Sequence, residues 1–176
     1  MEKVIRALPI LLMLFLSGAF RPATGEKKID WLSPTEAEAR SHTDPRPILI
    51  DLYTDWCGWC KVMDKKTYSR PGLIEYVNGK FHAVRLNAES RDPVEWGDRT
   101  YNYNAQAKVN QFAIDITRGQ LAFPTTVIVP ADGSAPQAIP GYLETKDMEL
   151  LLKYFGEGMY GKVDFDEFRK KFSPSW

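Results

Sequence analysis

The chain has 176 residues, of which 44% are hydrophobic and 26% are charged, and its formal net charge is zero. This length can bury the core of one domain, and the composition is that of an ordinary globular protein. The balanced charge gives no electrostatic reason to expect nucleic-acid binding.

Residues 1–25 have the pattern of a secretory signal peptide. Lys3 and Arg6 form a basic start, residues 7–16 are an apolar run, and small residues that suit cleavage follow. The run is shorter than the roughly 20 residues that span a bilayer, which argues against the alternative of an uncleaved anchor. We therefore expect an exported protein, periplasmic or extracellular, with a mature chain over 26–176 and no stable membrane insertion.

The remaining chain alternates between the hydrophobic periods of strands and helices. We predict strands over 29–31, 48–53, 81–86, 125–129 and 137–140. We predict helices that begin at Ser33-Pro34, where Ser33 is the N-cap, and that cover 58–67, 70–77, 104–118, 145–155 (capped by Thr145) and 165–172. This order indicates an α/β fold, a central mixed sheet with helices on both faces. We therefore expect a single domain over 26–176, whose last residues, 159–176, form a helical extension.

Both cysteines lie in the motif Cys57-Gly58-Trp59-Cys60, directly after an apolar strand and at the start of a predicted helix. Unpaired N–H groups and the helix dipole favour a thiolate at such a position. We therefore expect Cys57 to be the more exposed, more acidic nucleophile and Cys60 to be the resolving thiol of thiol–disulfide exchange.

Asp51 lies inside the apolar strand that precedes the motif. Burial there disfavours the charged carboxylate and raises its pKa, so that Asp51 can pass a proton to and from the resolving thiol; the alternative is a surface acid. A metal site is the alternative use of the cysteines. Zinc prefers four ligands, and only His42 and His82 are available, without ligand-like spacing. We expect no metal and no cofactor, and interpret His82 as a structural histidine.

Three separated segments resemble the thioredoxin superfamily, over roughly residues 29–158. They are ILIDLYTDWCGWCK at 48–61, VRLNAE at 84–89 and Phe123-Pro124-Thr125, and Gly141-Tyr142 also fits. Within the superfamily the chain is similar to secreted thioredoxin-like domains, including the periplasmic C-terminal domain of DsbD-type transmembrane reductases. Two features depart from thioredoxin itself: Trp59 stands where thioredoxin has proline, and the aromatic stretch at 92–103 is absent from it.

The resemblance implies a thioredoxin fold, a cis peptide bond before Pro124, and substrate contacts around the motif. The substrate-binding candidates are Trp56, Trp59, Phe123 and Pro124. The alternative for both tryptophans is a place in the core.

We interpret the chain as an exported protein-disulfide oxidoreductase whose substrate is a disulfide-containing protein. A reductase is favoured because no histidine stands between the cysteines, where it would help stabilise the thiolate and make the site more oxidising. An exported reductase implies a membrane thiol electron donor, and we expect a monomer. The alternatives are an oxidase or isomerase with the same residues, and a non-catalytic binding module.

The segment 91–103 is the most individual part of the chain, with Trp96, Tyr101 and Tyr103. It follows a strand whose carboxyl end lies at the same sheet edge as Cys57, so it can border the active site. The alternative is a peripheral loop packed by its own aromatic side chains.

Overall fold

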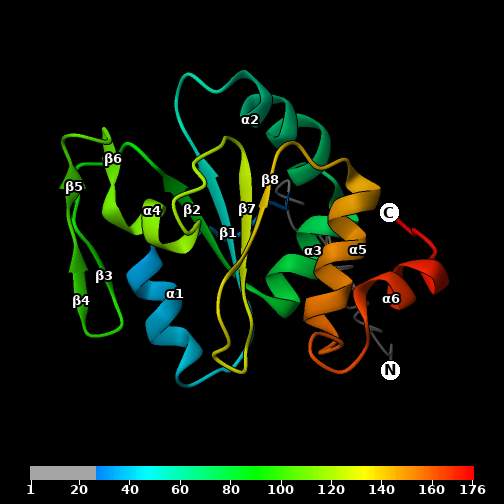
Figure 1. Cartoon of the computed structure of the whole chain (residues 1–176). Coiled ribbons are helices and arrows are strands. Elements are labelled where there is room, and N and C mark those ends of the chain that lie inside the picture. Colours follow the sequence, from blue (N-terminus) through cyan, green and yellow to red (C-terminus); the bar gives the residue numbers. More distant parts are fainter. Residues whose placement is uncertain (1–26) are drawn as a thin grey trace, which may run out of the picture.

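A computed structural model describes residues 27–176 (Figure 1), so the predicted signal peptide over 1–25 lies outside the described residues. The central sheet has the strand order β2–β1–β7–β8, with the bounds β1 Ile48–Tyr53, β2 His82–Asn87, β7 Thr125–Val129 and β8 Gln137–Pro140. Strands β1 and β2 are parallel, and β7 is antiparallel to both β1 and β8. The predicted mixed sheet is confirmed.

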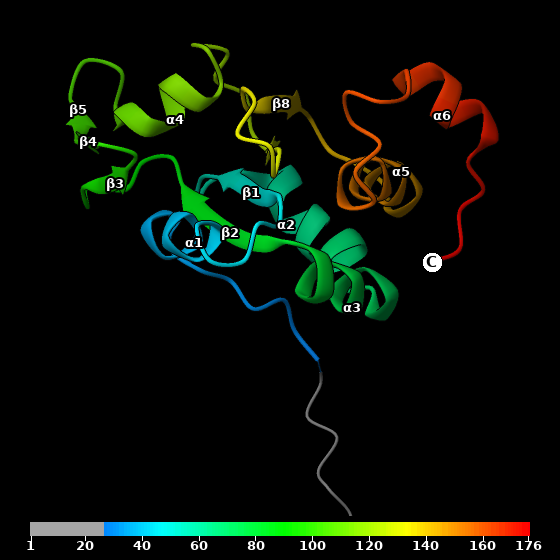
Figure 2. The same ribbon diagram turned by 90° about the horizontal axis from the view of Figure 1, so that it is seen from below.

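Helices cover both faces of this sheet, which Figure 2 shows end-on. One face carries α2 (Gly58–Met63), α3 (Pro71–Lys80) and α5 (Thr145–Gly156), and the other carries α1 (Pro34–Ser41) and α4 (Gln111–Ile116). The alternation of side chains along β1 divides the core between them. Leu49 packs in the first core, whereas Ile50 and Leu52 pack in the second. Asp51 therefore points to the same face as Leu49, the face that α2 covers.

The aromatic segment packs on the opposite face from α2. Its strands β3 (Val94–Trp96) and β4 (Arg99–Tyr101) form an antiparallel hairpin. The rings of Trp96 and Tyr101 lie 5.1 Å and 5.2 Å, between centroids, from the ring of buried Phe112 in α4. The hydroxyl of Thr35 in α1 donates to the carbonyl oxygen of Glu95 at 3.0 Å. These contacts favour the peripheral-loop interpretation over a border of the active site.

The helix predicted over 104–118 is wrong in its first half. Strands β5 (Tyr103–Asn104) and β6 (Val109–Asn110) form a hairpin there, and α4 begins only at Gln111. The side chain of Asn104 accepts hydrogen bonds from the N–H groups of two following residues, and Lys108 has a φ of 59°. Asn110 then caps α4 by accepting from the N–H of Phe112 at 2.9 Å. Local asparagine bonds thus override the helical spacing of the apolar residues.

Three other expectations need correction. The predicted strand at 29–31 is absent from the described chain, where only an isolated bridge joins Leu32 to Val84. The helix predicted over 58–67 is α-helical to Met63 and continues as the π-helix η1 (Asp64–Tyr68). Glu144 occupies the N-cap position of α5, since the hydroxyl of Thr145 instead donates to the carbonyl oxygen of Lys66 at 3.1 Å. The capping box at Ser33, in contrast, confirms the predicted start of α1.

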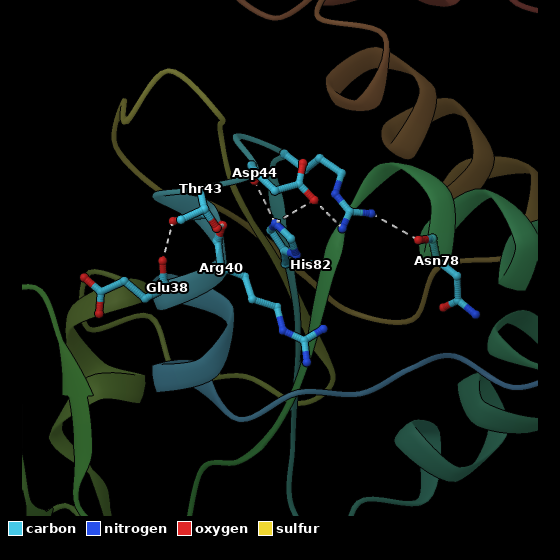
Figure 3. Close-up of polar contacts among 8 residues, drawn as sticks. Glu38, Arg40, Thr43, Asp44, Asn78 and His82 are labelled. Carbon is cyan, nitrogen blue, oxygen red and sulfur yellow. Dashed lines mark hydrogen bonds and ion pairs between the residues drawn. The ribbon is translucent and has the colours of Figure 1, made fainter.

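His82 joins the end of α1 to the start of β2 (Figure 3). Its side chain is buried, and its Nε2 lies 2.8 Å from the carbonyl oxygen of Asp44. A carbonyl oxygen only accepts, so this nitrogen carries the proton. Arg46 pairs with the Asp44 carboxylate at 2.6 Å and donates to the carbonyl oxygen of Asn78 at 3.1 Å. These contacts agree with the interpretation of His82 as structural.

The C-terminal segment is fastened to α5 by a buried carboxylate. This segment is residues 172–176, which follow helix α6 (Phe165–Lys171). The rings of Phe165 and Phe168 in α6 contact Tyr154 of α5. The Glu149 carboxylate accepts from the N–H groups of Ser175 and Trp176 at 2.9 Å and 3.1 Å, and pairs with Lys153 at 2.8 Å. Burial opposes ionisation, but the bonds from Lys153 and Ser175 hold the pKa of Glu149 below its ordinary value.

We predict that Glu149→Ala lowers the free energy of unfolding by about 2–3 kcal/mol, because the N–H groups of Ser175 and Trp176 lose their charged acceptor and Lys153 loses its partner. Glu167→Ala is the matched control, since Glu167 forms an exposed pair with Lys171 that contributes little. Urea unfolding of both variants measures the difference. Equal stability of the two would show that the carboxylate does not fasten the segment.

Candidate functional site

Cys57 and Cys60 form a disulfide at the start of α2, with their Cα atoms 5.3 Å apart. Cys57 is the N-cap residue, and its Sγ accepts from the main-chain N–H of Cys60 at 3.1 Å. When the bond is reduced, this N–H faces the sulfur of Cys57 and favours its thiolate over its thiol. The strand–turn–helix geometry therefore gives Cys57 the features of the nucleophile.

The expected difference in exposure between the two cysteines is wrong for the disulfide state. Cys57 is 3% exposed and Cys60 is 4% exposed. Each sulfur shields the other in the closed bond, so exposure does not distinguish the nucleophile in this state. The N-cap position and the bond from Cys60 N–H set Cys57 apart from Cys60 instead.

Asp51 is buried in the middle of β1, as the sequence predicts. Burial raises the pKa of its carboxyl to about 7, although nearby Arg85 lowers the pKa and Asp64 raises it. Within the described chain, the Oδ1 atom of Asp51 is buried without a hydrogen-bond partner. A carboxyl with this pKa exists in both protonation states near neutral pH, which suits a group that takes up and returns a proton.

Arg85 is the main part of the site that the sequence analysis missed. It lies opposite Asp51 in the parallel register of β1 and β2, with its Nε 3.6 Å from Asp51 Oδ2. Its stronger contact is with Asp64 in η1, where Nη2 donates to Oδ2 at 2.6 Å. The guanidinium also stacks on the ring of Tyr53, at 4.7 Å from the centroid. Arg85 is thus held mainly by Asp64, and its attraction for Asp51 does not overcome the burial of that carboxyl.

Arg85 could have been found in the sequence from the parallel pairing of the two strands, which places it opposite Asp51. The segment 84–89 resembles a central strand of the family, and parallel pairing with 48–53 places the charged Arg85 beside Asp51. The role of Asp64 required the structure, because Asp64 lies in η1, outside the two strands whose register places Arg85 beside Asp51.

Aromatic side chains from separate segments gather around the disulfide. Trp56 and Trp59 are 67% and 61% exposed, so the alternative of core positions is wrong for both. Trp56 contacts Phe123 edge-on at 5.9 Å between centroids and donates through Nε1 to Glu89 at 3.0 Å. The Phe123–Pro124 peptide bond is cis, as the resemblance implies. A pocket of about 290 Å³ adjoins these groups, lined by Trp59, Phe123, Pro124, Gly141 and Tyr142.

Metal clusters and membrane-spanning helices are both absent from the described residues. Over residues 27–176, no three or more histidine, cysteine or acidic side chains are grouped as metal ligands. None of the helices in this part of the chain has the length and apolar character to cross a membrane.

The chain belongs to the thioredoxin-like domain family, whose model it matches over residues 34–156. The matched segment includes the Cys57–Cys60 disulfide at the start of α2.

Several matched relatives carry the name thiol:disulfide interchange protein DsbD. The one from Citrobacter koseri is 42% identical over 52 residues, which are 30% of this chain and 8% of that protein. An uncharacterized protein of Caenorhabditis elegans is 23% identical over 104 residues, 52% of this chain and 14% of that protein. The chain thus spans less than a sixth of the length of these relatives.

Solved structures share the fold at low sequence identity. A thioredoxin-fold protein from Helicobacter pylori superposes with a TM-score of 0.57 at 18% identity, covering 84% of this chain and 85% of that one. The DsbH oxidoreductase superposes with a TM-score of 0.53 at 19% identity, covering 74% and 86%. These likenesses confirm the predicted thioredoxin fold.

We predict that Asp51→Asn stabilises the oxidised protein, and that the gain grows with pH. Because the native pKa of Asp51 is about 7 and its ordinary value is 3.8, the native state binds the proton more tightly than the unfolded state. The carboxyl therefore lowers the free energy of unfolding as pH rises from its ordinary pKa of 3.8 to its native pKa of about 7. Above that pH range, the loss reaches up to about 4 kcal/mol. Urea unfolding at about pH 4 and about pH 8 measures the gain. A gain that is equal at both values contradicts the raised pKa.

We predict that Arg85→Gln raises the pKa of Asp51 further, because the attraction that lowers it is removed. The pH at which stability stops falling should then move above that of the wild type. Comparing Arg85→Gln with the double variant Arg85→Gln/Asp51→Asn isolates the carboxyl, and Arg85→Lys is the charge-retaining control. If stability stops falling at the same pH as in the wild type, or at a lower pH, Arg85 does not act on Asp51.

Proposed function

We propose that this chain is an exported protein-disulfide reductase. The observation that carries the proposal is the disulfide at the start of α2, with Cys60 N–H directed at Cys57 Sγ, on the sheet face that also holds Asp51. This arrangement combines a stabilised nucleophile, a resolving thiol and a carboxyl that titrates near neutral pH.

The reaction begins with the reduced dithiol. The Cys57 thiolate attacks one sulfur of the substrate disulfide, and the other substrate sulfur leaves with the bonding electron pair and takes up a proton. The Cys60 thiol then gives its proton to the Asp51 carboxylate and attacks the Cys57 sulfur, and the second substrate sulfur leaves with the bonding electron pair and takes up a proton in turn. Two substrate thiols and the Cys57–Cys60 disulfide result. The main chain of Phe123, beside Pro124, holds the substrate as an extended segment.

The direction of the reaction and the source of electrons belong to the same proposal. Gly58 and Trp59 stand between the cysteines, so no imidazolium there stabilises the reduced form. The leader pattern over 1–25 supports export, and an exported reductase requires a membrane thiol donor. The name of the matched relatives, thiol:disulfide interchange protein, agrees with such an exchange. The protein acts as a monomer on a disulfide-containing protein.

We predict a reduction potential below about −200 mV, toward the reducing end of the range for dithiol proteins. Equilibration of the full-length protein with glutathione or dithiothreitol buffers measures it. A value near that of strong oxidants, at about −120 mV, would contradict a reductase and favour the oxidase.

The Cys60→Ser variant tests exchange itself and identifies the partner. Without the resolving thiol, the mixed disulfide between Cys57 and a substrate protein should accumulate in cells and be released by reductant. Cys57→Ser is the matched control, since it keeps one thiol and lacks the nucleophile. Equal trapping by both variants, or trapping by neither with no reduction of a small aromatic disulfide by the wild type, overturns the proposed activity.

A further inference from the structure

We propose that the polar pocket formed by β4, β5 and the start of α4 binds a neutral sugar, as a pyranose unit of an oligosaccharide. The pocket adjoins the aromatic segment, on the opposite sheet face from α2. Figure 1 shows these elements at the other end of the molecule from α5 and α6. The redox chemistry uses none of the pocket residues, so this inference is independent of the proposed function.

The pocket has the size of a ligand site and a wall rich in polar side chains. Its volume is about 610 Å³, within the range of about 300–1,000 Å³ typical of small-molecule sites, which leaves room for a disaccharide. Its lining side chains include two tyrosine rings, four carboxamides, one carboxylate and one guanidinium. This mixture of donors, acceptors and rings decides which ligands can be held.

A chain of contacts orients one part of the wall. Nδ2 of Asn104 donates to Oε1 of Gln111 at 3.0 Å, and Nε2 of Gln111 donates to Oδ1 of Asp115 at 2.9 Å. The other carboxylate oxygen of Asp115 lies 3.8 Å from Nη1 of Arg99. Because a carboxamide nitrogen carries two hydrogens, Asn104 and Gln111 each keep one donor beyond these bonds within residues 27–176. These groups are therefore positioned before a ligand arrives and can still bind one.

Two further carboxamides stand on a well-held main chain. The carbonyl oxygen of Asn102 accepts from the N–H of Gln111 at 2.9 Å, and the N–H of Gln106 donates to Oδ1 of Asn104 at 3.0 Å. In contrast, the side chains of Asn102 and Gln106 form no hydrogen bond with any other part of the described chain, and both residues are exposed. Each side chain thus offers a donor and an acceptor to a ligand.

The two tyrosine rings of the wall are braced from outside the pocket. The ring of Tyr101 packs on that of buried Phe112, at 5.2 Å between centroids. The guanidinium of Arg91 lies 4.6 Å from the centroid of the Tyr103 ring. Rings held in this way can pack against the C–H groups of a sugar ring, while their hydroxyls bond to its hydroxyls.

The charges of the wall indicate that the ligand is neutral and rich in hydroxyls. Asp115 and Arg99 are the acid and the base of the lining, and they face each other, so a charged ligand would lose water for little net attraction. A hydroxyl both donates and accepts, so neighbouring sugar hydroxyls match a carboxamide, which presents a donor beside an acceptor. A flat aromatic ligand would leave most of these polar groups without partners.

The experiment titrates the full-length protein with four neutral disaccharides, which are maltose, cellobiose, lactose and di-N-acetylchitobiose. Calorimetry measures the dissociation constant, and saturation-transfer NMR detects weak contacts. Chitobiose without its acetyl groups is the cationic comparison ligand, and cellobiuronate is the anionic one. We expect at least one neutral disaccharide to bind with a Kd of about 1 mM or below, and both charged ligands to bind at least about tenfold more weakly.

Three glutamine variants locate the binding site. Gln111→Ala should weaken binding about tenfold, because it removes one donor and releases both Asn104 and Asp115. Gln106→Ala changes an exposed side chain, so it should keep the fold and weaken binding about threefold. Gln120→Ala, at an exposed glutamine outside the pocket, is the matched control and should keep the wild-type affinity. The two pocket variants should keep the wild-type rate of disulfide exchange.

Several results would overturn the sugar site. Absence of binding by all four neutral disaccharides contradicts it directly, and tighter binding of either charged ligand contradicts a neutral ligand. Wild-type affinity in both pocket variants would place the binding elsewhere on the protein. An equal loss in Gln120→Ala would show that the effect is not specific to the pocket. Sugar binding by a protein that shows no disulfide exchange would support this inference and contradict only the proposed function.

Discussion

The cost of placing the Asp51 carboxyl inside the sheet is the constraint on which the site depends. A carboxylate in this position has lost most of its water. Arg85, the cation beside it, pairs more closely with Asp64 than with Asp51. A closer pair of Asp51 and Arg85 would hold the acid in its charged form and prevent it from keeping a proton at neutral pH. The contact of Arg85 with Asp64 therefore leaves the Asp51 carboxyl with a pKa of about 7, which the proposed proton transfer requires.

The parts of the site lie at three turns next to the ends of strands. The cysteines lie at the turn between β1 and α2, Phe123 and Pro124 lie before β7, and Tyr142 lies after β8. These turns lie close together because β7 is antiparallel to β1, which places the start of β7 beside the end of β1. The sheet thus brings the cysteine pair, the Phe123–Pro124 segment and the aromatic pocket together.

The sequence predicted the central strands, the cysteine pair and the burial of Asp51, because each rests on local spacing or on a short motif. It did not predict the hairpin before α4, since the apolar spacing of Val109, Phe112 and Ile116 also fits a helix. Asn104 and Asn110 decide that segment through hydrogen bonds whose geometry the spacing does not contain. Arg85 was missed for another reason: its role arises from Asp51 and Asp64, partners far away in the sequence.

The two cores on either side of the sheet also bear on how such a protein can diversify. The hairpin of β3 and β4 adds Trp96 and Tyr101 to the core of α1 and α4, whereas the acid and its partners lie on the other face. Energetic effects of changes at separated, non-contacting sites add almost independently. Lineages can therefore lengthen, shorten or replace the segment between β2 and α4 while selection on the redox chemistry continues to act on a different set of residues.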